Sequence, residues 1–216
     1  MLFNLISILA FFLRADETTY QTMKAVVPKC TALIHQCNQG DNTIDSFACQ
    51  SAFVVCNVGL TSPYQMTGLN PYDIRKKCAK PPLCYDFSSV QTWLNKPEVM
   101  NALGVDTAHV HRWESCNFGI NSKFHTDWMK DFSPFVLDLL DKAGVPVLIY
   151  AGDVDFICNY LGNQAWSMEL PWKGQEGFNK DTPADWKGQG LARVSADDKM
   201  FTFLQVYDAG HMVPAE

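Results

Sequence analysis

Several features that would indicate a membrane or nucleic-acid partner are missing from this 216-residue sequence. The apolar stretch at residues 2–13 is too short to span a bilayer, which takes about 20 residues of helix, so no membrane span is expected. Lys and Arg form no runs, and the formal net charge of -6 argues against electrostatic binding to nucleic acid. Repeats, low-complexity tracts and N-x-S/T sequons are also absent, so N-glycosylation is not expected. With 47% hydrophobic residues, the chain can still bury a sizeable core.

The N-terminal segment 1–16 has an origin that the sequence leaves open. Its apolar stretch resembles the core of a signal peptide, yet no Lys or Arg precedes it and no A-x-A cleavage site follows. A signal peptide, a buried segment and a misplaced start codon all remain compatible with it.

Eight cysteines are many for a reducing compartment and favour an oxidising one. Cys30 and Cys37, and likewise Cys49 and Cys56, are seven residues apart, which places each pair on one face of a helix. The joint at 38–45 is rich in turn formers and too short for a parallel return, so the two helices run antiparallel. This arrangement predicts two nested disulfides, Cys30–Cys56 and Cys37–Cys49. A zinc site is the competing interpretation, although zinc knuckles usually have closer spacing.

The other four cysteines are less constrained by their spacing. Cys78 and Cys84 flank a proline-bent loop whose ends can meet, so a third disulfide is expected between them. Cys116 and Cys158 are left over, and the spacing does not decide whether they pair, stay free or bind elsewhere.

The C-terminal half alternates between helical and extended patterns. Residues 89–105 read as a helical region interrupted at Pro97, and residues 128–145 have a helical period. Residues 146–152 form an apolar run typical of a buried parallel strand, 158–170 suit a helix, and 200–210 suit a strand. This order predicts an α/β fold.

Two further assignments complete this outline. The Gly- and Lys-rich stretch 173–190 is expected to be an exposed loop. The disulfide-bonded, mostly helical region 17–88 is expected to form a cap separate from residues 89–216.

Asp155 and His211 each lie just past a predicted strand, at the edge where open parallel sheets build their sites. Their order matches the last two members of the Ser, Asp, His series of α/β-hydrolases, in which a buried carboxylate orients the imidazole that takes the nucleophile's proton. A helix N-cap for Asp155 and a plain loop position for His211 are the simpler alternatives. The "HVH" at 109–111 lacks further ligands, so it is read as surface, and neither a metal nor a cofactor is expected.

Several motifs together resemble those of the serine carboxypeptidases, the group of carboxypeptidase Y and cathepsin A. The resemblance runs from about residue 17 to the end, and the matching segments are "YAGDVDFICNYLGNQAW" (150–166), "AGHMVP" (209–214), "PYDIRKKC" (71–78), "LCY" (83–85), "ESCNF" (114–118) and "DWM" (127–129). It implies a partial α/β-hydrolase fold with a disulfide-stapled helical cap.

The resemblance also implies roles for individual residues. Asp155 and His211 match the triad aspartate and histidine of a reaction that releases C-terminal residues from peptides by acyl transfer. Cys158 matches a free cysteine near the nucleophile, and Met212 matches a residue of the pocket for the departing amino acid. The other expected pocket residues are Asn57, Tyr72, Tyr85, Trp128 and Ile157.

The nucleophile that the family requires is not in this sequence. None of the serines is flanked by glycines at positions -2 and +2, as the G-x-S-x-G elbow demands. The oxyanion-hole segments and the central strands that the family places before the cap are also missing, so the chain alone is expected to be poorly stable and inactive. Cys116 matches a cysteine that pairs with one in that missing half, so it is expected to be an unpaired thiol in this chain. A disulfide through Cys116 to another chain would support a two-chain enzyme.

Three interpretations follow from this resemblance. The chain is part of a serine carboxypeptidase, either as a fragment or as the second chain of a two-chain enzyme, or it is a non-catalytic binding protein derived from the family. A small secreted protein unrelated to hydrolysis fits the motifs poorly. The expected location is the vacuole, the lysosome or the outside of the cell.

Overall fold

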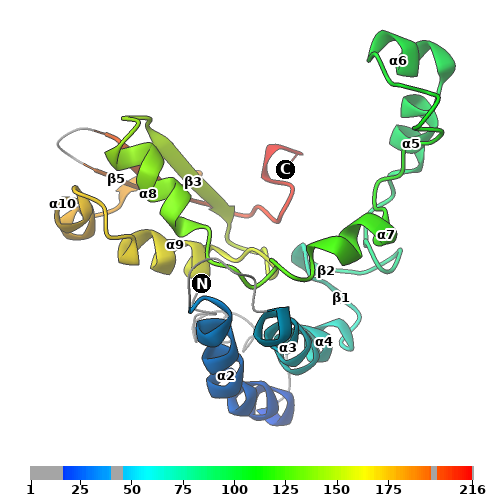
Figure 1. Cartoon of the computed structure of the whole chain (residues 1–216). Helices are drawn as coiled ribbons and strands as arrows, with labels where there is room; N and C mark the ends of the chain where they lie inside the picture. Colours follow the sequence, from blue (N-terminus) through cyan, green and yellow to red (C-terminus); the bar gives the residue numbers. More distant parts are fainter. Residues whose placement is uncertain (1–16, 40–45, 196–198, 216) are drawn as a thin grey trace.

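The computed structural model describes residues 17–39, 46–195 and 199–215, and Figure 1 shows three regions in it. A group of helices forms the disulfide-rich region, a four-stranded sheet with its helices forms a second, and an arm projects away from both. Within the described residues no helix is both long enough and apolar enough to cross a bilayer.

The disulfide-rich region begins with a helical hairpin. Helix α2 (Glu17–Cys37) packs against α3 (Ser46–Cys56), and the disulfides Cys30–Cys56 and Cys37–Cys49 join them in the nested order expected from the spacing. All four cysteines are buried in the core between the helices. Because their sulfurs bond to one another, the zinc alternative is wrong.

A short hairpin connects this region to the rest of the chain. The π-helix η1 (Asn57–Thr61) and α4 (Ser62–Gln65) continue α3, and β1 (Leu69–Asn70) then pairs antiparallel with β2 (Asp73–Lys77). The third expected disulfide, Cys78–Cys84, closes the loop after β2. The mainly helical cap predicted for 17–88 therefore also contains an extended hairpin.

The sheet has the strand order β3-β6-β5-β4. Strand β3 (Val147–Gly152) runs parallel to β6 (Phe201–Val206), whereas β5 (Gly190–Val194) and β4 (Ala184–Asp185) are antiparallel to their neighbours. Among the described residues, β3 is an edge strand that pairs only with β6. The expectation that it is covered on both faces is wrong, because Leu148 and Tyr150 are about half exposed, at 53% and 49%.

One face of the sheet is covered by α8 (Ser133–Asp141) and α9 (Tyr160–Glu169), which both contact β3. The predicted helix at 128–145 is thus shorter than expected, with Pro134 in its first turn, where a missing N–H costs nothing. Phe201 lies at the centre of this core with no exposed surface, surrounded by the rings of Trp166, Trp172 and Phe178.

The stretch 173–190 is not the exposed loop that its composition predicted. It contains α10 (Gln175–Lys180) and β4, and its Phe178 is completely buried. The buried Arg193 of β5 donates hydrogen bonds to the carbonyl oxygens of Phe178, at 3.0 Å, and Asn179, at 3.2 Å. These contacts fix the end of a helix whose own residues are mostly polar.

The arm consists of α5 (Ser88–Leu94), α6 (Pro97–Ala102), α7 (Phe118–Asn121) and the 3-10 helix η2 (Ser122–Phe124); Figure 1 shows α5 and α6 extending away from the sheet. The predicted break at Pro97 is confirmed. Large apolar side chains of this arm are exposed, namely Val90, Trp93, Leu103, Val110, Phe118, Ile120 and Phe124. His109 and His111 are exposed too, as expected for a surface segment.

Candidate active site

The candidate site is built where two parallel strands end side by side. Strands β3 and β6 pair in register up to Gly152 and Val206, so the loops that follow them leave the same edge of the sheet. The first loop carries Asp155 and the second carries His211, ahead of the 3-10 helix η3 (Val213–Ala215). Residues 56 positions apart in the sequence thus become neighbours.

Asp155 and His211 form a hydrogen-bonded dyad. His211 Nδ1 lies 2.9 Å from Asp155 Oδ2. The other carboxylate oxygen, Oδ1, accepts a hydrogen bond of 3.2 Å from the Cys158 amide. Asp155 is 5% exposed, whereas the His211 side chain is 34% exposed. An ionised carboxylate can only accept hydrogen bonds, so Nδ1 carries the proton and the unprotonated Nε2 is the atom left for chemistry.

Burial of Asp155 disfavours the negative charge on its carboxylate. Removal from water raises the pKa of its carboxyl above the ordinary value, and the hydrogen bonds from His211 and Cys158 reduce that effect without cancelling it. The carboxylate is therefore less favoured in the folded chain than in water, and the hydrogen bonds from His211 and Cys158 reduce this penalty.

Two glycines allow the loops to approach this closely. A Cβ at Gly152 would lie 2.0 Å from the carbonyl oxygen of Ala209, and a Cβ at Gly210 would lie 2.4 Å from that of Tyr72. Backbone atoms cannot yield at such distances, so a larger residue at Gly152 would push the Asp155 and His211 loops apart. A larger residue at Gly210 would push the His211 loop away from the β1–β2 turn.

The turn between β1 and β2 lies against both loops. The carbonyl of Pro71 accepts hydrogen bonds from the Phe156 and Ile157 amides, at 3.1 and 3.0 Å. The carbonyl of Tyr72 accepts one from the His211 amide at 2.8 Å. This hairpin therefore connects the two halves of the dyad through the backbone.

Five of the expected pocket residues lie around the dyad. The Tyr72 ring is 5.2 Å from the His211 imidazole and 5.7 Å from the Tyr85 ring, measured between centroids. Ile157 and Cys158 come two and three residues after Asp155, and Met212 follows His211 directly. Burial raises the pKa of the Tyr72 hydroxyl, with smaller contributions from Cys116, Cys158 and Asp155, so Tyr72 stays a neutral donor.

The remaining two expected pocket residues are attached elsewhere. Asn57 donates a 2.8 Å hydrogen bond to the carbonyl of Phe53 in α3. The Trp128 ring packs edge-on against the Phe53 ring, with 5.8 Å between centroids. Trp128 also lines a groove of about 640 Å³ together with Phe132, Leu137 and Trp166. Their contacts thus tie Asn57 and Trp128 to the helical region, and their substrate role stays a prediction.

Asp155, Cys158 and His211 have donor atoms within 4.8 Å of one another, which raises the question of a metal. These residues suit a metal poorly. His211 Nδ1 and both Asp155 oxygens are already engaged in hydrogen bonds. Partial removal of water and the charge of Asp155 raise the pKa of the Cys158 thiol to about 11, which disfavours the thiolate that binds metals.

Sequence reasoning missed one group next to the site. Asp73 is completely buried and pairs with Arg75 at 2.8 Å, at the end of the hairpin that touches both loops. Both lie within the "PYDIRKKC" motif, but a charged pair in a basic stretch gave no signal that one of its members would be buried.

The same arrangement of strands and loops occurs in a known class of proteins. The structure superposes on Kex1(Δ)p, a prohormone-processing carboxypeptidase from Saccharomyces cerevisiae, with a TM-score of 0.66 at 23% identity, covering 96% of this chain and 48% of that one. The chain therefore has part of an α/β-hydrolase type fold.

The sequence comparisons identify the family. Residues 7–216 match the model of the serine carboxypeptidase family, to which the chain belongs. It is 47% identical over 192 residues to carboxypeptidase Y of Candida albicans, covering 87% of this chain and 34% of that protein. It is 45% identical over 206 residues to carboxypeptidase Y homolog A of Leptosphaeria maculans, covering 92% and 36%. The chain thus spans about a third of the length of these relatives.

Proposed function

We propose that this chain supplies the Asp–His part of a serine-type carboxypeptidase site. The observation that carries the proposal is the 2.9 Å hydrogen bond between buried Asp155 and His211, whose side chain is 34% exposed, at the edge where two parallel strands end. Family membership supports the reaction type, which is acyl transfer from the last peptide bond of a substrate.

In this reaction a serine outside these 216 residues attacks the scissile carbonyl carbon. His211 Nε2 takes the serine proton and then gives it to the departing amino group, while Asp155 keeps Nδ1 protonated and stabilises the imidazolium. Water then attacks the acyl-enzyme and loses a proton to His211, which passes it to the serine oxygen as the ester bond breaks and the shortened peptide is released. Substrate contacts are assigned to Tyr72, Tyr85 and Met212, which surround the imidazole or follow it in the chain.

The exposed apolar surface supports the view that this chain acts as part of a larger assembly. On β3, Leu148 and Tyr150 are exposed, and the arm exposes Trp93 and Phe118 at 54% and 60%. Surfaces of this kind usually contact other protein. We assign them to the remaining portion of a serine carboxypeptidase, which would also bring the nucleophile and the groups that bind the substrate carboxylate.

Cys116 provides a covalent route to such a partner. It is a free, partly exposed thiol on the arm, with the exposed Val110 and Phe118 on either side of it in the sequence, and we assign it a disulfide to a second chain. The division into a cap at 17–88 and a core portion at 89–216 belongs to the same proposal. So does a location in the vacuole, lysosome or secretory pathway, which the three disulfides favour.

The test is reconstitution. The chain is co-expressed with the portion of Candida albicans carboxypeptidase Y that lies outside the matched region. Release of C-terminal amino acids from a blocked dipeptide is then measured. We expect activity in the mixture and none in either part alone. His211→Ala is expected to lower it by about 10⁴-fold or more, because the serine loses its base.

The control is Lys142→Ala, an exposed residue of the α8 terminus that lies outside the dyad. It should leave the reconstituted activity unchanged. A complex that forms and remains inactive, although the relative's intact enzyme is active in the same assay, would refute the catalytic role and favour a binding protein derived from the family.

A further inference from the structure

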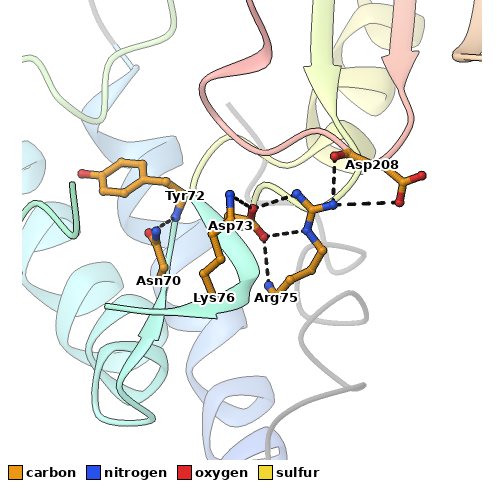
Figure 2. Close-up of polar contacts among 6 residues, drawn as sticks. All are labelled: Asn70, Tyr72, Asp73, Arg75, Lys76 and Asp208. Atoms are coloured by element: carbon orange, nitrogen blue, oxygen red, sulfur yellow. Dashed lines mark hydrogen bonds and ion pairs between the residues drawn. The ribbon is translucent and has the colours of Figure 1, made fainter. Parts of the chain in front are cut away.

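The β1–β2 hairpin contains a buried carboxylate between two cations (Figure 2). The Asp73 side chain has no exposed surface. Arg75 Nε donates to Asp73 Oδ1 at 2.9 Å, and Arg75 Nη2 donates to Oδ2 at 2.8 Å. Lys76 Nζ also lies 2.8 Å from Oδ2. The Asp73 carboxylate therefore accepts a bidentate pair of hydrogen bonds from one side of the guanidinium, which fixes the plane of the guanidinium as well as its position.

Asp73 stays ionised in this environment. Burial by itself would raise its pKa, but the hydrogen bonds from Arg75 and Lys76 outweigh that effect and hold the pKa well below the ordinary range. A buried ion pair adds little net stability over an apolar pair of the same size, so the position of Arg75 calls for another explanation.

The other side of the guanidinium provides this explanation. Arg75 Nη1 donates a 2.9 Å hydrogen bond to the backbone carbonyl of Asp208, as Figure 2 shows. The Asp208 carboxylate is farther away, at 3.9 Å, and 95% exposed, so the carbonyl is the main acceptor. Asp208 lies three residues before His211 in the loop that follows β6.

Besides the His211–Asp155 bond of the dyad, hydrogen bonds from the hairpin and from the Asp155 loop hold the loop 208–211. The His211 amide donates to the Tyr72 carbonyl at 2.8 Å, the Val154 amide donates to the Ala209 carbonyl at 3.1 Å, and Arg75 holds Asp208. The first two are backbone bonds that any sequence could make. Arg75 adds a bond donated by a charged side chain of the β1–β2 hairpin. It acts at the start of the loop, where the chain leaves β6, beside the Asp153 carboxylate, which accepts a hydrogen bond from the Asp208 backbone.

We propose that Arg75, oriented by Asp73, is a positioning residue that holds the loop 208–211 so that His211 Nδ1 stays within hydrogen-bond distance of Asp155. Arg75 contacts neither member of the dyad through the bonds described and acts through the backbone. The inference rests on the proposed role of the dyad, but it concerns geometry and is testable without any peptidase activity.

The experiment is nuclear magnetic resonance on the full chain, with two measurements. The first is the Nδ1–H proton resonance of His211, which appears far downfield when the proton is held by Asp155. The second is amide hydrogen exchange at His211 compared with Phe203 in the centre of β6. For Arg75→Gln we expect loss of the downfield resonance and exchange at His211 about 10- to 100-fold faster, with Phe203 unchanged, because a charged hydrogen bond to the loop is removed.

Two variants serve as matched controls. Lys76→Met removes the other cation from Asp73 and leaves the bond from Arg75 to Asp208 in place. Asp208→Asn removes the distant carboxylate charge but keeps the carbonyl acceptor and a residue type that tolerates the positive φ of 53°. Both are expected to retain the downfield resonance and the slow exchange at His211.

The outcomes separate positioning from general stability. An unchanged resonance in Arg75→Gln, or an equal loss in Lys76→Met, overturns the proposal. If Arg75→Gln also speeds exchange at Phe203, Arg75→Lys distinguishes a loss of positioning from a loss of overall stability. The lysine ammonium group can still pair with Asp73, but it lacks a second nitrogen for the Asp208 carbonyl. In Arg75→Lys, the Phe203 amide should stay protected from exchange, while the downfield His211 resonance should be lost. Retention of both the protection and the resonance, or loss of both, refutes the positioning role. None of these readouts depends on whether the reconstituted enzyme is active.

Discussion

Asp155 has opposing effects on stability and on the proposed chemistry. The carboxylate must be ionised to hold the His211 proton, yet burial raises the pKa of Asp155 above its unfolded value of 3.8. The folded chain therefore binds a proton at this position more tightly than the unfolded chain does. Residues of this kind are typical of sites where function requires an energetically unfavourable arrangement.

The sign of the resulting pH dependence is fixed. As pH rises from 3.8 through the raised pKa, the unfolded chain loses its proton first, so the stability contributed by Asp155 falls, and the loss is complete above that pKa. Asp155→Asn does not titrate. Relative to the unmodified chain, its free energy of unfolding should rise across this window and stay constant above it, measured by urea denaturation between pH 3 and pH 8.

Asp73→Asn should show the opposite dependence of stability on pH. Hydrogen bonds from Arg75 and Lys76 lower the pKa of Asp73, so its stabilising contribution is present above 3.8 and is lost as pH falls below that value. Asp73→Asn should therefore be less stable than the unmodified chain at neutral pH, with a gap that narrows in acid. Equal pH profiles for the two variants would contradict both assignments.

The helical hairpin α2–α3 depends on covalent links because it is small. Its core consists of few large side chains, and the four buried cysteines occupy its centre. Below a certain size, a domain buries too little apolar surface to be stable without such links. The disulfides Cys30–Cys56 and Cys37–Cys49 join the two ends of the helical pair, as their nested order requires.

Removing one disulfide should cost about 2–4 kcal/mol of unfolding free energy, because it releases a loop of the unfolded chain. The double substitution Cys37→Ala and Cys49→Ala opens the inner link, and Cys30→Ala with Cys56→Ala opens the outer one. Chemical denaturation followed by circular dichroism measures both. The exposed substitution Val58→Ala in η1 is the control and should change little. A loss below about 0.5 kcal/mol for either pair would show that the link is dispensable.

Local patterns predicted these helices better than the strands. The spacing of the cysteines indicated α2 and α3 with their pairing, and Pro97 marked the boundary of α6. The short strand β4 and helix α10 were missed, because their stretch is rich in Gly, Lys and Asp. Long-range contacts hold them: Phe178 packs on Phe201, and Arg193 binds the end of α10. Such contacts join residues distant in sequence, so local sequence patterns do not predict them.

In the part of the chain that the structure describes, one edge of the sheet is unpaired. Strand β3 ends the sheet of the described residues, and Leu148 and Tyr150 on it are exposed, so its unpaired backbone groups can template another strand. In the proposed enzyme this edge would be covered by the remaining portion of the fold. In the isolated chain it favours self-association.

Leu148→Lys should lower self-association of the isolated chain, because a charge on an edge strand hinders pairing with a second one. Analytical ultracentrifugation over a range of concentrations measures the effect. Val58→Lys makes the same change at an equally exposed position of the helical region and should leave association unaltered. If both substitutions act alike, general solubility rather than the edge of β3 explains the result.

The sequence by itself determined the family and two of the three disulfide-forming patterns that the structure contains. The order of Asp155 and His211 behind two strands, and the symmetric cysteines, pointed to the family, to which the chain belongs. None of its serines is flanked by glycines in the G-x-S-x-G pattern, which is why the proposal assigns this chain the Asp–His part of a site.

Only the tertiary structure decided how that part is assembled. The 2.9 Å approach of His211 to Asp155 requires β3 and β6 to pair in parallel, and it requires Gly152 and Gly210 to admit the neighbouring backbone. The burial of Asp73 and the reach of Arg75 to Asp208 likewise arise from packing. Periodicity in the sequence reports which face of an element is apolar, whereas contacts between residues more than a hundred positions apart depend on how the elements dock, and that is decided by the fold as a whole.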